Sequence, residues 1–289
     1  MRILRSSRVQ DAGQVRQPWG MMATPQLSIV IPAYNESARI ERTLQRVMAC
    51  VDRQGWDAEV LVVDDGSVDR TVEIVRRWME RERRLYLVQN DGNRGKGYSV
   101  RNGLLQASGE VVMFTDADLS APMEEAERLM AAIAEGADVA IGSRWMDSAR
   151  QTLHQPMYRR FFGRCFNGVT RTVMGLPFKD TQCGLKAFKR TAAQVIFRLQ
   201  RIERWGFDPE ILFIARKLGY DIREVAVTWG HDERSRMSYL RDGMKMLEEI
   251  AAIRVNSIAG RYDRDIAALK DTSTMVTAPV KPEKASPSA

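Results

Sequence analysis

Histidine and cysteine are scarce in this chain of 289 residues. The two histidines, His154 and His231, stand in no recognisable catalytic triad. The three cysteines are widely spaced, odd in number and form no CxxC pair. This spacing excludes a disulfide framework and a cysteine-based zinc site, and it predicts reduced thiols in a cytosolic protein.

Long apolar runs are absent as well. No stretch approaches the ~18 apolar residues of a membrane-spanning helix, and residues 1–20 lack the apolar centre of a signal peptide. We therefore expect a cytoplasmic protein without a transmembrane helix, whose contact with a membrane is peripheral and at its cytoplasmic face.

What the chain does have is positive charge and an ordinary globular composition. The formal net charge is +7, and hydrophobic residues make up 44%, so we expect anionic partners and one large α/β domain over residues 26–262. Residues 1–25 are basic and aperiodic and are predicted to be a disordered arm. Residues 263–289, rich in Thr, Pro, Lys and Ser, are predicted to be a disordered tail.

Short apolar runs alternate with amphipathic helical patterns through the first half of the chain. This alternation predicts a doubly wound, mostly parallel sheet of Rossmann-like type, with peripheral amphipathic helices. Loops at the carboxyl edge of such a sheet converge on one crevice, where ligands bind. The predicted strands cover residues 27–32, 60–63, 85–88, 111–115 and 139–141.

The most informative strand, residues 111–115, runs directly into Asp116-Ala117-Asp118. Two carboxylates one residue apart at a strand end can both turn toward a hard divalent cation, and Mg²⁺ usually takes only one or two of them. The same pattern also fits an Asx turn or a helix cap without metal. Whether this motif binds a metal or only forms a turn has to be decided from the surrounding motifs.

A glycine-rich basic loop, residues 90–97, follows the third strand. It is neither a Walker A loop nor GxGxxG, because Gly97 stands where Ser or Thr would hold Mg²⁺. It can bring backbone N–H groups and Lys96 near phosphates, or it can be a simple turn. Arg144, at the end of the strand 139–141, suits an anionic ligand.

Residues 158–174 combine aromatic residues at helical spacing with four arginines. Two interpretations stay open. One is a helix lying on an anionic lipid surface, and the other is an amphipathic helix packed on the sheet with a solvated basic face.

Eight motifs in order resemble the inverting GT-A glycosyltransferases of family 2, and within them the dolichyl-phosphate (polyprenyl-phosphate) beta-glucosyltransferases. The resemblance covers residues 27–253. The motifs are IPAYNES, VVDDGSVDRT, NRGKGYSVRNG, FTDADLS, GSR, RRFFGRCFN, DTQCGLKAFKR and WGFDPEILFIARKLGY.

The resemblance assigns roles to individual residues. Lys96 would lie beside the diphosphate of the donor, and Arg144 and Arg160 would clamp the acceptor phosphate. Asp180, or else Asp208, would be the base if one is used. The nucleoside would be held by Pro32, Tyr34, Glu36, Val63 and Asp65, and the diphosphate would be placed through Mg²⁺ or Mn²⁺ by Asp116, Ala117 and Asp118.

Two positions depart from the family pattern. Ser120 stands where mannosyl relatives carry a Gln that can reach the metal. In the loop expected to close over the donor, Ser235-Arg236 replaces the Ser-Lys of many relatives, and Arg lacks the point-donor geometry of Lys.

The resemblance implies transfer of a hexose, glucose by subtype, from a UDP-sugar to a polyprenyl or dolichyl phosphate. An acceptor phosphate with a second pKa near ~6 is already anionic at neutral pH, so no strong base is required. One alternative keeps the fold and donor but uses a soluble saccharide acceptor. Another is a nucleotide-sugar binding protein without turnover, and no nucleic-acid partner is expected, since no RNA-binding module is present.

Overall fold

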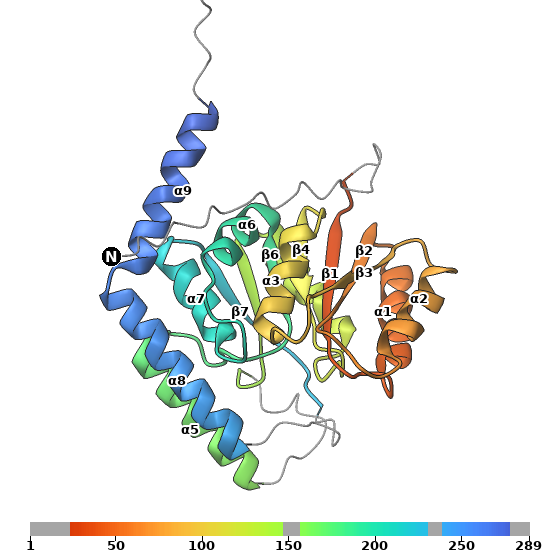
Figure 1. The fold of residues 1–289 in the computed structure, drawn as a ribbon, viewed down its shortest axis with the longest axis horizontal. Coiled ribbons are helices and arrows are strands. Elements are labelled where there is room, and N and C mark those ends of the chain that lie inside the picture. Colours follow the sequence, from red (N-terminus) through yellow and green to blue (C-terminus); the bar gives the residue numbers. More distant parts are fainter. Residues whose placement is uncertain (1–23, 147–156, 231–238, 278–289) are drawn as a thin grey trace, which may run out of the picture.

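The computed structural model describes residues 24–146, 157–230 and 239–277. A seven-stranded sheet of order β3-β2-β1-β4-β6-β5-β7 forms its centre (Figure 1). The strands are β1 (Leu27–Ala33), β2 (Ala58–Asp64), β3 (Leu85–Gln89), β4 (Val111–Phe114), β5 (Val139–Ser143), β6 (Lys186–Lys189) and β7 (Ile222–Ala226). The helices are α1 (Ile40–Gln54), α2 (Thr71–Met79), α3 (Lys96–Gln106), η1 (Met123–Glu125), α4 (Ala126–Ala134), α5 (Met157–Met174), α6 (Arg190–Leu199), α7 (Phe207–Lys217), α8 (Tyr239–Ile258) and α9 (Arg261–Thr277).

The predicted mostly parallel sheet is confirmed. β1 pairs in parallel with both β2 and β4, and β2 with β3, while β6 runs antiparallel between β4 and β5. The chain therefore moves outward from β1 to β3 and then returns to the other side of β1. This reversal places a crevice outside the carboxyl ends of β1 and β4, the position where open α/β sheets bind ligands.

Both faces of the sheet are covered, which explains why its inner strands are apolar on both sides. Helices α1, α2 and α4 bury one face, with Leu44, Val75 and Leu129 in the same core cluster. Helices α3, α6 and α7 cover the face turned to the viewer in Figure 1 and contribute to a second cluster.

Helices α5 and α8 pack side by side and extend away from the sheet (Figure 1). In that view β1 enters from above, so the carboxyl edge of the sheet faces downward, the direction in which α5 and α8 also extend. The helix predicted over residues 158–174 corresponds to α5. Within the described residues, no helix is both long and apolar enough to cross a bilayer.

The expected tail begins inside a helix. α9 covers Arg261–Thr277, so the predicted boundary at residue 263 is not a structural boundary. Ile266 and Leu269 pack against the core cluster of α3, α6 and α7, and Asp265 forms a 2.5 Å ion pair with Arg201. The sequence prediction of a disordered tail rested on the Thr, Pro, Lys and Ser content of the following residues and overlooked this apolar pair at helical spacing. Residues 1–23 and 278–289 lie outside the described part.

Candidate functional site

The loops after β1 and β2 are tied together by side-chain hydrogen bonds. The backbone N–H of Asn35 donates to Ser67 Oγ at 2.9 Å, and that of Glu36 donates to Thr71 Oγ1 at 2.8 Å. Asn35 adopts φ +54°, a left-handed conformation that Asn tolerates better than most residues. The predicted nucleoside residues lie in these loops and at the strand ends beside them: Pro32, Tyr34, Glu36, Val63 and Asp65.

Asp65 is buried and organises the glycine-rich loop. One carboxylate oxygen accepts hydrogen bonds from Asn90 Nδ2 at 2.8 Å and from the backbone N–H of Arg94 at 2.9 Å, and the other accepts from the N–H of Gly95 at 2.8 Å. These bonds fix the loop directly before Lys96, the first residue of α3. The predicted contact of Asp65 with the nucleoside stays a prediction.

Lys96 and Asp116 form the central ion pair of the site, with 2.5 Å between Nζ and Oδ1. Burial would lower the pKa of Lys96, but the carboxylates of Asp116 and Asp208 outweigh it and the net shift is upward. The ammonium also lies 5.6 Å from the ring centre of Trp205 and 5.9 Å from that of Phe207. Lys96 is therefore a fixed positive charge at the carboxyl edge.

Asp118 follows Asp116 in a tight turn, in which Leu119 adopts φ +48°. Its Oδ1 accepts the backbone N–H of Ser120 at 2.9 Å. Burial and the charge of Asp116 raise the pKa of Asp118. Keeping both carboxylates ionised is therefore costly, and a second cation in addition to Lys96 would stabilise them.

The donor set at this turn fits Mg²⁺ or Mn²⁺. Among the described residues no cluster of three or more metal-binding side chains exists, but a hard divalent cation needs only one or two protein carboxylates when substrate phosphates complete its shell. Asp116 and Asp118, both half-buried, would hold it, with Ala117 between them.

Gly184 lies directly against the Asp116 carboxylate. A Cβ on Gly184 would come within 2.0 Å of Asp116 Oδ2 and 2.5 Å of its Cγ. Only glycine therefore leaves room for this rotamer of Asp116. This contact could not be predicted from the sequence, because it joins two loops far apart in the chain.

Arg144 and Asp180 form a bidentate pair at the end of β5. The guanidinium donates from Nε to Oδ2 at 2.6 Å and from Nη2 to Oδ1 at 2.8 Å, and the backbone N–H of Arg144 adds a third bond at 3.0 Å. Burial would raise the pKa of Asp180, but Arg144 outweighs it and holds it below its usual range. Such a carboxylate is a weak base, so the geometry favours a positioning role for Asp180.

A second buried pair, Lys186 with Asp208, lies beneath the site. Lys186 is fully buried in β6, and its Nζ donates to Asp208 Oδ1 at 2.5 Å and to the carbonyl oxygen of Cys183 at 2.6 Å. Burial raises the pKa of Asp208, although Lys186 and Lys96 oppose the shift. Sequence reasoning overlooked Lys186, since its only signal was its place within the motif DTQCGLKAFKR.

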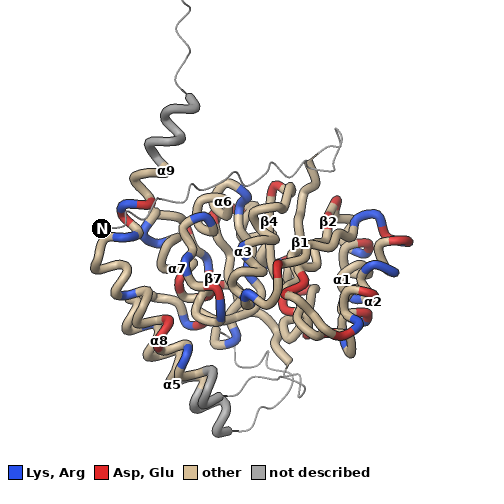
Figure 2. Tube along the Cα trace, in the orientation of Figure 1, with Lys and Arg blue, Asp and Glu red and all other residues tan. Residues whose placement is uncertain are grey.

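Two predicted residues are not brought into this arrangement by the described structure. Arg160 lies in the first half of α5, and its side chain is outside the described part. Arg236, with the whole loop of residues 231–238, is outside it as well. In Figure 2 acidic residues, red on the tube, gather beside the lower end of β1.

Comparison with known proteins agrees with this geometry. The Glycosyl transferase family 2 model matches residues 28–197. Dolichyl-phosphate beta-glucosyltransferases from Drosophila melanogaster and Saccharomyces cerevisiae are 31% and 32% identical; the alignments cover 82% of this chain in both cases, and 77% and 76% of the relatives. A further one from Trichomonas vaginalis is 34% identical over 81% of this chain and 72% of its own.

Among solved structures, glucosyl-3-phosphoglycerate synthase from Mycobacterium tuberculosis in complex with UDP has the same fold. Its TM-score is 0.58 at 22% identity, over 80% of this chain and 79% of that one. The strand order, the carboxylate turn after β4 and the sequence matches lead to one assignment: the chain belongs to glycosyltransferase family 2, with the GT-A fold, and within it to the dolichyl-phosphate beta-glucosyltransferase family.

Proposed function

We propose that this protein transfers glucose from UDP-glucose to the phosphate of dolichol or a related polyprenol, with inversion at the anomeric carbon. Relatives that match over most of this chain are named dolichyl-phosphate beta-glucosyltransferases, and glucosyl-3-phosphoglycerate synthase was also crystallised with Mn²⁺ and UDP. The observation that carries the proposal is the Lys96–Asp116 pair beside Asp118 at the carboxyl edge of the sheet.

In this reaction an oxygen of the acceptor phosphate attacks the anomeric carbon, and the bond from that carbon to UDP breaks. A divalent cation bound at Asp116 and Asp118 would act as a Lewis acid on the leaving diphosphate. Lys96 stabilises the same developing charge, since it is held in place by Asp116 and by the loop that Asp65 fixes.

The acceptor needs orientation more than deprotonation. Its phosphate is already anionic at neutral pH, and Arg144 is a donor held in one orientation by both oxygens of Asp180. Asp180 would then act through Arg144, and a guanidinium fixed in this way can align a phosphate for in-line attack. The predicted contribution of Arg160 remains part of this proposal.

We also propose that α5 and α8 contact the membrane in which the acceptor resides. Their outer surface exposes apolar side chains, which on α8 recur at helical spacing, and most of the described length of α8 is uncharged in Figure 2. This fits a peripheral helix pair at a lipid surface better than a solvated one. The exposed residues are Val169, Val173, Met244, Leu247, Val255 and Ile258.

The test of the function is a donor and acceptor panel. Purified full-length protein is incubated with Mn²⁺ or Mg²⁺, a short-chain polyprenyl phosphate and labelled UDP- and GDP-sugars, and label entering the organic phase is counted. We expect label from UDP-glucose alone, and its loss with EDTA. A parallel incubation replaces the lipid by a saccharide or by 3-phosphoglycerate. Label transferred only to these soluble acceptors would overturn the lipid acceptor while leaving the transferase.

Gly184→Ala is expected to impair the donor side without unfolding the protein. The new methyl group would force the Asp116 carboxylate out of its present position, and a misplacement of this size costs about 10²-fold in turnover. The half-saturating Mn²⁺ concentration should rise together with this loss, which a metal titration of activity measures.

The matched control is Gly243→Ala on α8, where a Cβ meets no atom within 4 Å. This variant should keep wild-type activity and metal affinity. An unchanged metal requirement in a folded Gly184→Ala protein would show that the position of Asp116 is not set by this contact.

A further inference from the structure

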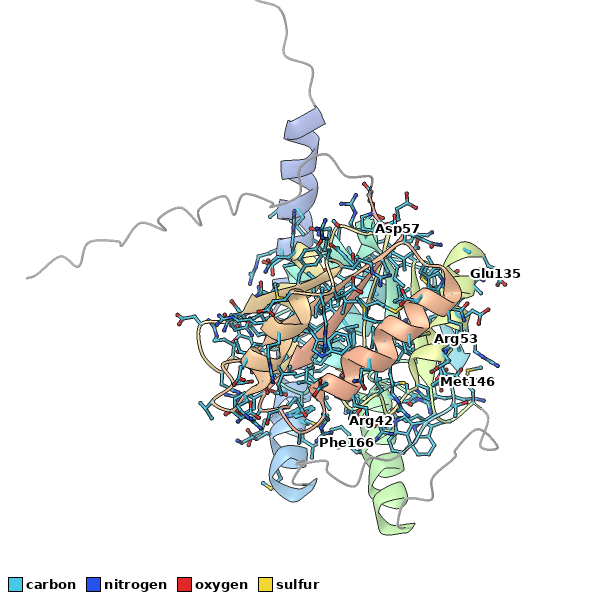
Figure 3. The ribbon with its side chains drawn as sticks, turned by 90° about the vertical axis from the view of Figure 1, so that its right-hand side faces the viewer. Arg42, Arg53, Asp57, Glu135, Met146 and Phe166 are labelled. Atoms are coloured by element: carbon cyan, nitrogen blue, oxygen red, sulfur yellow. The ribbon has the colours of Figure 1, made fainter. Side chains whose placement is uncertain are left out.

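A small cationic pocket lies beside the Arg144–Asp180 pair and has no role in the mechanism above. Its volume is about 230 Å³, and it forms where α5 meets the end of β5 and the loop that leads to Asp180. The residues that line it are Trp145, Asn167, Gly168, Arg171 and Lys179. Figure 3 shows Phe166, the neighbour of Asn167, and Met146, the neighbour of Trp145, toward the end of the molecule from which α5 and α8 project.

The two cations of this pocket form no ion pair within the described structure, although the Glu224 carboxylate accepts the backbone N–H of Lys179 at 2.9 Å. Arg171 Nε is buried and has no hydrogen-bond partner there, and neither Arg171 nor Lys179 forms an ion pair with another described side chain. A buried, unsatisfied guanidinium nitrogen is costly, so the site favours an anion.

The arginines of a second cavity, in contrast, are paired with carboxylates. A cavity of about 370 Å³ lies between α1 and α2. Its two arginines, Arg77 and Arg81, face Glu73 at 3.8 Å and Glu41 at 3.9 Å. Both arginines of that cavity therefore face a carboxylate, whereas Arg171 and Lys179 form no ion pair with a described side chain.

The walls of the cationic pocket are preorganised. Asn167 donates from its amide to the backbone carbonyl of Lys179, and its Oδ1 accepts the hydroxyl of Thr181 at 3.0 Å. A Cβ on Gly168 would meet no atom within 4 Å, so the pocket is open on that side. The polar wall is thus fixed while the entrance stays clear.

The surroundings indicate what kind of anion fits. Val169 and Val173, on the same helix as Arg171, are 46% and 38% exposed. At about 3.6 residues per turn these valines lie on the opposite side of α5 from Asn167, Gly168 and Arg171, so they do not line the pocket. The anion is identified from the place of the pocket beside the Arg144–Asp180 pair, where the proposed function puts a lipid-borne phosphate.

We propose that Arg171 and Lys179 bind the phosphate group of a lipid in this pocket. The phosphate can belong to the polyprenyl phosphate acceptor or to a phospholipid of the surrounding membrane. The first source rests on the proposed function, whereas phosphate binding at the pocket does not.

The first experiment measures membrane binding without turnover. Full-length protein is floated with phosphatidylcholine vesicles with and without phosphatidylglycerol. Arg171→Gln and Lys179→Gln should each weaken binding to the anionic vesicles by about tenfold, the usual scale of a charged hydrogen bond. Gly168→Glu, which adds a carboxylate at the open side, should weaken it as well, while Arg83→Gln, which removes an exposed charge between α2 and β3, away from α5 and α8, should change it little.

The second experiment identifies the source of the phosphate. The KM for a short-chain polyprenyl phosphate is measured in neutral detergent. If the acceptor occupies the pocket, Arg171→Gln raises this KM by about tenfold, and Arg171→Lys, which keeps the charge, recovers part of the loss. If a membrane phospholipid occupies it, the KM is unchanged and only vesicle binding falls.

The two proposals fail separately. Absence of turnover with every polyprenyl phosphate, together with weakened vesicle binding of the pocket variants, would reject the lipid acceptor and retain the pocket. Folded Arg171→Gln and Lys179→Gln proteins that match wild type in both vesicle binding and KM would reject the pocket.

Discussion

Asp118→Asn is expected to reduce glucosyl transfer by at least about 10²–10³-fold, the scale on which enzymes lose a single preorganised electrostatic group. The substitution removes one of the two carboxylates that would hold the divalent cation, and it leaves Lys96 to face the diphosphate alone. The side chain is half-buried at a turn, and an Asn oxygen can still accept the N–H of Ser120, so the fold should persist. The measurement is turnover with UDP-glucose and polyprenyl phosphate, together with the melting temperature.

Glu110→Gln is the matched control for this prediction. Glu110 is an exposed carboxylate just before β4, at the amino end of the strand whose carboxyl end leads to Asp116 and Asp118. Its replacement changes the net charge by the same amount at the opposite edge of the sheet and should leave turnover unchanged. Normal turnover of a folded Asp118→Asn protein would contradict the metal-holding role of Asp118 and reopen the binding-protein alternative.

The donor half of the site could be predicted from the sequence because it depends on local rules. Apolar runs identified β1, β2 and β4, and the topology of β-α units then placed the residues after them at one edge. This reasoning brought Lys96 together with Asp116 and Asp118, and the structure places Lys96 and Asp116 2.5 Å apart. No contact between distant loops had to be known.

The remaining features depend on long-range packing. From the sequence alone, Lys186 is expected to be a polar, solvent-facing residue of a strand. It is fully buried because β6 is inserted between β4 and β5 in the middle of the sheet. The contact of Gly184 with Asp116 requires the same insertion. Asp65 was predicted as a ligand, yet its oxygens hold the loop before Lys96, a function that follows from tertiary geometry rather than from the motif.

The second large effect is expected on stability. Lys186→Met should lower the free energy of unfolding by about 3–5 kcal/mol, because it leaves the buried carboxylate of Asp208 without its cation. Lys189→Met, three residues later, removes a lysine whose ion pair with Asp138 is 38% exposed on the lysine side, and it should cost at most about 1 kcal/mol. Urea or guanidinium unfolding of the two variants compares a buried with an exposed pair in one short strand.

The pH dependence of the Lys186→Met variant separates lost charge compensation from lost packing. The pKa of Asp208 is already raised by burial, and loss of Lys186 should raise it further in the folded state only. A carboxyl group whose folded pKa exceeds its unfolded pKa destabilises the protein as pH rises above the unfolded value. The deficit of the variant should therefore be smaller near pH ~4, the unfolded value for Asp, and larger at neutral pH, whereas a packing defect would be the same at both.

The double variant Lys186→Met/Asp208→Leu removes both charges of the buried pair. Replacing both members of a buried ion pair by apolar side chains is often neutral or stabilising, so this protein should recover most of the stability that Lys186→Met loses. Its turnover then reports what Asp208 contributes to the charge of Lys96 in a folded enzyme. If the double variant is less stable than Lys186→Met, Asp208 has a structural role apart from Lys186, and the pair is not the unit that holds β6 against α7.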